Sequence, residues 1–149
     1  MSFAKPSLKG RALRLLSGRE YSRTELERKL ASFEEEPGTL SLALDDLQAK
    51  GFISDARVIE SVIHRRTGKL GLMRIRQELQ GKGLDPEAVA QALGGLKNSE
   101  RERAQEVWRK KFGAVAADAQ DAARQMRFLA SRGFGGDVIR QVVKGDSDD

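Results

Sequence analysis

An internal repeat constrains the fold of this chain more than any other feature of its sequence. When the sequence is shifted by about 49 positions, Leu30 falls on Leu79. A further shift of about 50 positions places Leu79 on Leu129 and Gly83 on Gly133. A short unit that cannot bury its own apolar face gains by stacking on its neighbours, so we expect the units to share interfaces. The repeat therefore predicts a row of similar modules, which offers an extended surface rather than a catalytic pocket.

The spacing of apolar residues is helical in every unit. Ser22 and Glu25 fit a capping box, which marks the start of a helix. Gly51, Gly83 and Gly133 are placed to end helices in the left-handed conformation. The first unit should carry three apolar stripes: Ala12, Leu13, Leu15 and Leu16; then Leu26, Leu30 and Phe33; then Leu40, Ala43, Leu44 and Leu47.

No run of β-branched residues alternates with polar ones, so we expect no sheet. The predicted fold is all-α, an elongated and curved tandem array of three three-helix units that resemble helix-turn-helix modules. We expect an N-terminal arm at residues 1–9, repeat units at 10–53, 54–97 and 98–144, and a disordered polar tail at 145–149.

Composition narrows the class of protein. Cys is absent, so neither a disulfide framework nor a thiolate metal site is possible. No apolar signal segment is visible near the N-terminus, and the apolar runs are too short to cross a bilayer, so we expect a cytoplasmic protein without membrane contact. The formal net charge of +5 favours nucleic acid or an acidic protein as the partner.

The sequence supplies no set of residues for catalysis. His64 is the single histidine, and no nucleophile or carboxylate stands at a spacing that would make it catalytic. Asp45 and Asp46 are adjacent and cannot face the same way on a helix. Lys69 follows Gly68 but lacks the upstream glycine of a phosphate-binding loop. We therefore expect no enzyme activity, no metal and no cofactor.

Clusters of cations are the remaining candidates for a binding site. The most lopsided cluster lies within residues 64–82, where Glu78 is the single acid. Near the end of one helix, Arg65 and Arg66 can be explained as partners of the helix dipole. Arg74 and Arg76 lie near a helix start, where cations are disfavoured, so an anionic partner would explain them. The full set of candidate binding residues is Arg65, Arg66, Lys69, Arg74, Arg76, Lys82, Arg109, Lys110, Lys111, Arg124, Arg127 and Arg132.

Two further features of the sequence lie outside this candidate set. Residues 5–19 carry five cations and no acid. Trp108 and Phe112 lie on one stripe with Ala104, which favours a place in the core over a role in base stacking.

Several segments resemble the bacterial RecX regulators, and the resemblance covers roughly residues 10–143. They are ALRLLS at residues 12–17, ELERKL at 25–30, LQAKGFISDAR at 47–57 and RIRQELQGKGL at 74–84. Val58 and Ile59 stand where that family usually has an aromatic residue followed by alanine. The third unit is similar only in its apolar pattern and in Gly133.

The resemblance implies a function that spacing alone does not give. RecX proteins bind the RecA recombinase, lodge in the groove of the RecA–DNA filament, and suppress ATP hydrolysis and strand exchange. They also bind single- or double-stranded DNA, more weakly. The resemblance thus implies a monomeric regulator of homologous recombination, DNA repair and the SOS response, with the RecA nucleoprotein filament as its partner and no chemistry of its own.

A DNA-binding regulator built from tandem helix-turn-helix modules is the alternative. Its recognition helices should present Arg, Asn or Gln to base edges. The predicted third helices, at residues 39–50 and 85–96, are poor in such residues, and Asp45 and Asp46 in the first of them would repel phosphate. An enzyme is the third possibility and has the least support.

Overall fold

A computed structural model describes residues 5–145 of the chain. Residues 1–4 of the expected arm and residues 146–149 of the expected tail lie outside that part. The described part is all-α, as predicted, and contains no strand. Its elements are α1 (Leu8–Gly18), α2 (Arg23–Leu30), a 3₁₀ turn η1 (Ala31–Phe33), α3 (Thr39–Ala49), α4 (Asp55–Arg66), α5 (Leu72–Gln80), α6 (Pro86–Lys97), α7 (Glu100–Lys111), α8 (Ala119–Ser131) and α9 (Gly136–Lys144).

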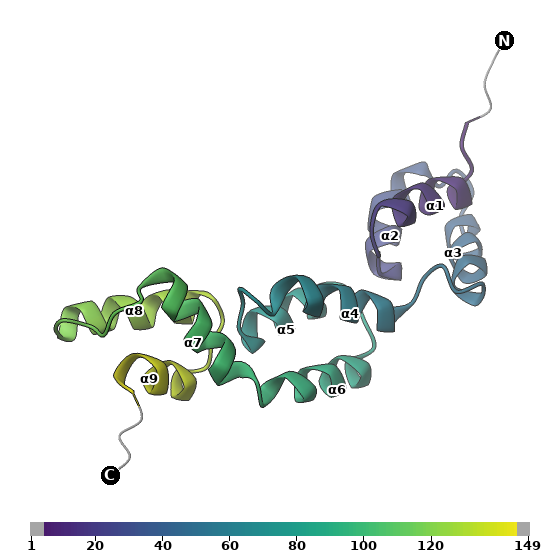
Figure 1. Ribbon diagram of the computed structural model, residues 1–149. Helices are drawn as coiled ribbons and strands as arrows, with labels where there is room; N and C mark the ends of the chain where they lie inside the picture. The colour runs from purple at the N-terminus through teal and green to yellow at the C-terminus, as the bar shows by residue number, and fades with distance from the viewer. Residues whose placement is uncertain (1–4, 146–149) are drawn as a thin grey trace.

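The helices form three groups of three in an elongated row (Figure 1). Helices α1 to α3 make the first unit, α4 to α6 the second, and α7 to α9 the third. The second and third units lie in line, and the first is set at an angle to them, so the row is bent (Figure 1). Helix α1 begins at Leu8, inside the stretch 1–9 that the sequence suggested as an arm. None of the helices in the described part is both long and apolar enough to cross a membrane.

Local sequence signals account for where the helices begin and end. The predicted capping box is confirmed, because the Ser22 hydroxyl accepts from the Glu25 amide and the Glu25 carboxylate accepts from the Ser22 amide. Gly51, Gly83 and Gly133 have φ values of 84°, 65° and 92°, which confirms the left-handed stops. These stops fix the short turns that join the helices of each unit.

Each unit has its own apolar core. Leu30, Leu79 and Leu129, which the repeat placed at equivalent positions, are all buried. The prediction that Phe33 continues the apolar stripe of Leu26 and Leu30 is wrong. Its side chain is 45% exposed, because the chain tightens into η1 at Ala31 and turns the ring outward. Leu13 is likewise exposed on α1.

The second and third units meet through main-chain hydrogen bonds. The Gly71 amide donates to the Arg132 carbonyl at 2.7 Å, and the Met73 amide donates to the Gly133 carbonyl at 3.1 Å. Around this contact, the Arg103 guanidinium donates to the Leu70 carbonyl at 2.9 Å. The turn after α8 therefore sits directly on the start of α5.

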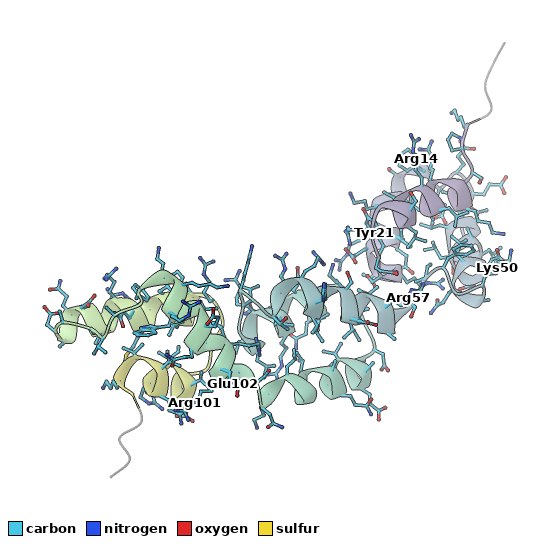
Figure 2. The ribbon with its side chains drawn as sticks, viewed as in Figure 1. Arg14, Tyr21, Lys50, Arg57, Arg101 and Glu102 are labelled. Atoms are coloured by element: carbon cyan, nitrogen blue, oxygen red, sulfur yellow. The ribbon has the colours of Figure 1, made fainter. Side chains whose placement is uncertain are left out.

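The first and second units meet at the corresponding place but through side chains. The turn after α5 sits on the start of α2, where Lys82 Nζ lies 3.1 Å from Glu25 Oε2. Arg28 donates to the Gly81 carbonyl at 3.1 Å. Arg57, which lies between the two units in Figure 2, pairs with Glu20 at 3.0 Å. The two junctions thus repeat one geometry with different chemistry.

Candidate functional site

Three of the predicted cations are exposed and uncommitted in the second unit. Arg65 lies in the last turn of α4, Lys69 in the turn that follows, and Arg76 on α5. Within the described residues, none of the three has an ion pair or a side-chain hydrogen bond. The chain reverses between α4 and α5, so the helix end that carries Arg65 and Lys69 lies beside the start of α5 (Figure 1). These side chains can accept an anionic partner without breaking a contact inside the protein.

Other members of the predicted cluster already have partners. Arg66 Nη2 lies 3.0 Å from Glu78 Oε1, so the single acid of this segment neutralises one of its cations. Arg74 Nη1 donates to the Ser131 carbonyl at 2.7 Å. That carbonyl belongs to the last turn of α8, where the helix dipole is negative. This contact gives a structural reason for a cation near a helix start, which sequence reasoning assigned to an external anion.

The structure does not bring Lys82 together with the other cations. It lies beyond the opposite end of α5, where its side chain is 13% exposed and paired with Glu25. Burial alone would raise the pKa of Glu25. Hydrogen bonds from the Ser22 amide, Arg19 and Lys82 outweigh that effect and lower the pKa from 4.5 to about 2. Lys82 is therefore part of the junction between the first and second units.

In the third unit, three of the six predicted cations pair with an acid of their own helix. Arg109 and Lys110 both lie near the carboxylate of Glu106, and Arg124 lies 2.7 Å from Asp121. Hydrogen bonding to Arg109 lowers the pKa of Glu106. These ion pairs are exposed and screened by salt, so each contributes little energy and its cation can exchange the acid for another anion.

Three predicted cations of the third unit lie over two phenylalanine rings, whereas Arg127 is exposed on α8 without such a contact among the described residues. Phe112 and Phe128 meet edge to face with ring centroids 5.4 Å apart. Lys111 and Arg132 lie over the Phe128 ring, at 5.4 and 4.8 Å from its centroid. Arg124 lies 5.1 Å from the centroid of Phe112. Sequence reasoning missed Phe128, although its i,i+4 spacing to Arg132 is the signal that would have indicated the contact.

The rings that were expected in the core are only half-buried. Trp108 packs on the third core and donates from Nε1 to Gln125 Oε1 at 2.8 Å. Phe112 is half-buried against Phe128 rather than at the centre of the unit. Gln125 is itself buried and donates to the Ala114 carbonyl. A buried polar network of this kind holds the long turn between α7 and α8 in place.

The arrangement favours binding of anions over chemistry. Exposed Lys and Arg side chains only donate hydrogen bonds, so they can bind carboxylate or phosphate oxygens. In the part of the chain that the structure describes, no group of three or more His, Asp or Glu residues could hold a metal ion.

Comparison with known proteins identifies the family. Residues 54–93 match the family described as RecX, second three-helix domain, and residues 99–143 match RecX, third three-helix domain. The chain is 54% identical over 138 residues to the regulatory protein RecX of Leptothrix cholodnii, covering 93% of this chain and 88% of that protein. It is 47% identical over 143 residues to regulatory protein RecX of Chromobacterium violaceum, covering 96% and 93%.

Solved structures agree with this result at the level of the fold. A crystal structure of RecX from Lactobacillus salivarius superposes with a TM-score of 0.78 at 22% identity, covering 92% of each chain. A second crystal structure of a regulatory protein RecX gives a TM-score of 0.76 at 19% identity, covering 93% of this chain and 72% of that one. The repeat, the three helical units and the sequence relationships together show that the chain belongs to the RecX family of regulatory proteins.

Proposed function

We propose that this protein regulates recombination by binding the RecA–DNA filament and inhibiting RecA ATP hydrolysis and strand exchange. The observation that carries the proposal is its membership of the RecX family over nearly the whole chain. The elongated row of units suits an extended binding surface, and the protein acts without catalysis of its own. We further propose that it works in the cytoplasm as a monomer.

We propose that the uncommitted cations are the main contacts with the filament. In the second unit they are Arg65, Lys69 and Arg76, which are exposed and have no partner within the described residues. In the third unit the corresponding residues are Lys111, Arg127 and Arg132, which are exposed and have no carboxylate partner within the described residues, although Lys111 and Arg132 lie over the Phe128 ring. The remaining candidates, Arg66, Arg74, Lys82, Arg109, Lys110 and Arg124, have internal partners and would contribute less.

DNA within the filament is a second anionic target for the same residues. Lys and Arg contacts to phosphate release condensed counterions, so binding should weaken steeply as salt rises. The half-buried pair of Phe112 and Phe128 adds an aromatic surface beside Lys111 and Arg132. We propose that direct binding to DNA is weaker than binding to the filament, because the third helices of the units carry few side chains suited to reading bases.

The test is the rate of RecA ATP hydrolysis on single-stranded DNA, with this protein added at substoichiometric amounts. The parent should inhibit. Reversing Arg65, Lys69 and Arg76 to Glu should raise the concentration for half-inhibition roughly tenfold or more, since exposed ionic contacts contribute up to about 1 kcal/mol each. Circular dichroism should remain helical, because none of the three side chains supports the fold.

A matched control distinguishes loss of the proposed contacts from the effect of the change in net charge. Reversing Lys50, Lys97 and Lys144 to Glu makes the same change in net charge at other exposed positions, and inhibition should persist. Neutralising Glu35 and Glu36 to Gln should also be tolerated. No inhibition by the parent would overturn the proposed function. Equal inhibition by the reversed variant and the parent would overturn the assignment of the binding residues alone.

A further inference from the structure

A small hollow in the first unit is lined by residues that are not among the proposed filament contacts. It lies between α1, α2 and η1, with a volume of about 230 Å³. Its apolar lining includes Leu15, Leu30 and Phe33. Sites for small molecules begin at roughly 300 Å³. A hollow of this size is therefore suited to one or two side chains of a partner rather than to a cofactor.

The cations that line the hollow differ from most others of the first unit, because they form no ion pair in the part of the chain that the structure describes. Arg11, Arg14 and Lys29 line it, and no acidic residue does. Within the described residues, these three have no carboxylate partner. The other cations of the unit are engaged, apart from Lys5 in the adjoining hollow: Lys9, Arg19, Arg23 and Lys50 are in ion pairs, and Arg28 donates to a carbonyl.

An exposed aromatic ring forms part of the same surface. Phe33 is 45% exposed; the other exposed large apolar side chains of the unit, Leu13, Leu42 and Phe52, do not line this hollow. The Arg11 guanidinium lies 3.9 Å from the centroid of that ring, a cation–π contact that holds both side chains at the rim. The 3₁₀ turn η1 places the ring outside the core of the unit, which Leu26, Leu30 and Leu44 close without it. An apolar surface ringed by cations matches a ligand that is apolar at its centre and acidic around it.

We propose that this hollow docks an acidic peptide segment of a partner protein. One aliphatic or aromatic side chain of the segment sits against Leu15, Leu30 and Phe33. Carboxylates on either side of it pair with Arg11, Arg14 and Lys29. This inference goes beyond the proposed filament surface, because the site lies in the first unit and does not depend on which protein supplies the segment.

The lining favours a peptide over a nucleic acid base. Its polar side chains, Arg11, Arg14 and Lys29, only donate hydrogen bonds. A base inserted here would leave its own N–H donors without a side-chain acceptor, and burying such groups unpaired is costly. An aliphatic side chain needs no such partner.

The test uses the full chain, labelled with ¹⁵N, and a short peptide with a central leucine flanked on each side by two glutamates. Amide shifts on titration should concentrate at Gly10, Leu30 and Ser32 and leave the third unit unchanged. Replacing the leucine with glycine, or the glutamates with glutamine, should each weaken binding about fivefold or more. Unchanged affinity for either altered peptide would overturn the match between the hollow and its ligand.

Variants of the protein locate the site. Arg14→Glu and Lys29→Glu should each weaken binding of the peptide about fivefold. Lys50→Glu is the matched control, since Lys50 and Arg14 lie on different sides of the first unit (Figure 2), and it should bind as the parent does. An oligothymidine that shifts the same amides more strongly than the peptide would overturn the proposal in favour of nucleic acid. Peptide shifts spread over all three units would also overturn it. A failure here would leave the RecA assay of Arg65, Lys69 and Arg76 unaffected.

Discussion

The two junctions between units occupy equivalent places in the repeat but are built from different groups. Between the second and third units, amides at the start of α5 donate to carbonyls of the turn after α8. Between the first and second units, the equivalent turn is held by Lys82 on Glu25 and by Arg28 on a carbonyl. Main-chain hydrogen bonds between packed backbones respond little to salt. The ion pairs of the first junction are screened according to their exposure, so Arg57–Glu20, with side chains 45% and 31% exposed, responds more than Lys82–Glu25, at 13% and 16%.

The residues at two equivalent positions of the repeat explain this difference between the junctions. Glu25 and Arg74 are equivalent in the repeat, as are Lys82 and Arg132. The first junction therefore has opposite charges at these places, and the second has two cations that cannot pair. In the second junction Arg74 donates to the Ser131 carbonyl instead, and Arg132 lies over Phe128. The second and third units should accordingly behave as one body, to which the first is joined more loosely.

Truncating a core leucine of the middle unit should cause the largest loss of stability, because that unit contacts both of the others. Leu79 is fully buried, and Leu79→Ala should lower the free energy of unfolding by about 2–5 kcal/mol. Urea denaturation followed by circular dichroism measures the loss. A loss under about 0.5 kcal/mol, the range of surface sites, would contradict the placement of Leu79 at the centre of the unit.

Adding one methyl group at the second junction should have the next largest effect. A Cβ at Gly71 would lie 2.5 Å from the backbone of Gly133 and Phe134, where nothing can give way cheaply. The φ of Gly71 is −84°, so Gly71→Ala tests the close approach and not backbone strain. We expect a loss of about 1–3 kcal/mol.

Gly68→Ala is the matched control for that substitution, since its Cβ would meet nothing within 4 Å. The single Trp108 lies in the third unit, and its fluorescence during urea denaturation reports whether that unit loses stability when the junction is strained. Equal stability of the two variants would show that the second junction is not closely packed.

Removing the ion pair of the first junction should cost less, about 1–2 kcal/mol for Lys82→Met at neutral pH. The contribution of Glu25 depends on acidity. Its pKa is lowered in the folded state from 4.5 to about 2, so the stability that it provides is complete above pH 4.5 and lost as the pH falls toward 2. The difference between parent and Lys82→Met should therefore shrink over that range. A difference that stays constant in acid would mean that the pair does not support the junction.

The repeat and the turn residues made most of the fold predictable from the sequence. Gly83 and Gly133 lie where the self-match placed them, and Leu30, Leu79 and Leu129 are buried as expected. Phe33 was assigned wrongly, because helical periodicity continues through a position where the backbone has already tightened into a 3₁₀ turn.

The candidate site was less predictable, because charge counts do not show which cations are already paired. Glu78 lies twelve positions from Arg66, and Glu25 lies much farther from Lys82 along the chain, yet both acids neutralise their partners. Arg74 likewise has an internal acceptor in another unit. Only the packing of the units separates these residues from Arg65, Lys69 and Arg76, which remain free to bind a partner.

The most direct test of the contrast between the junctions is a pair of distance distributions measured by pulsed electron spin resonance. The chain has no Cys, so spin labels can be placed by Leu42→Cys with Gln91→Cys, and by Gln91→Cys with Val115→Cys, all at exposed positions. Raising salt from about 0.1 M to about 1 M shortens the screening length from about 10 to about 3 Å. The distribution between labels 42 and 91 should broaden, and that between 91 and 115 should not. Broadening of the 91–115 distribution to the same extent would contradict the account.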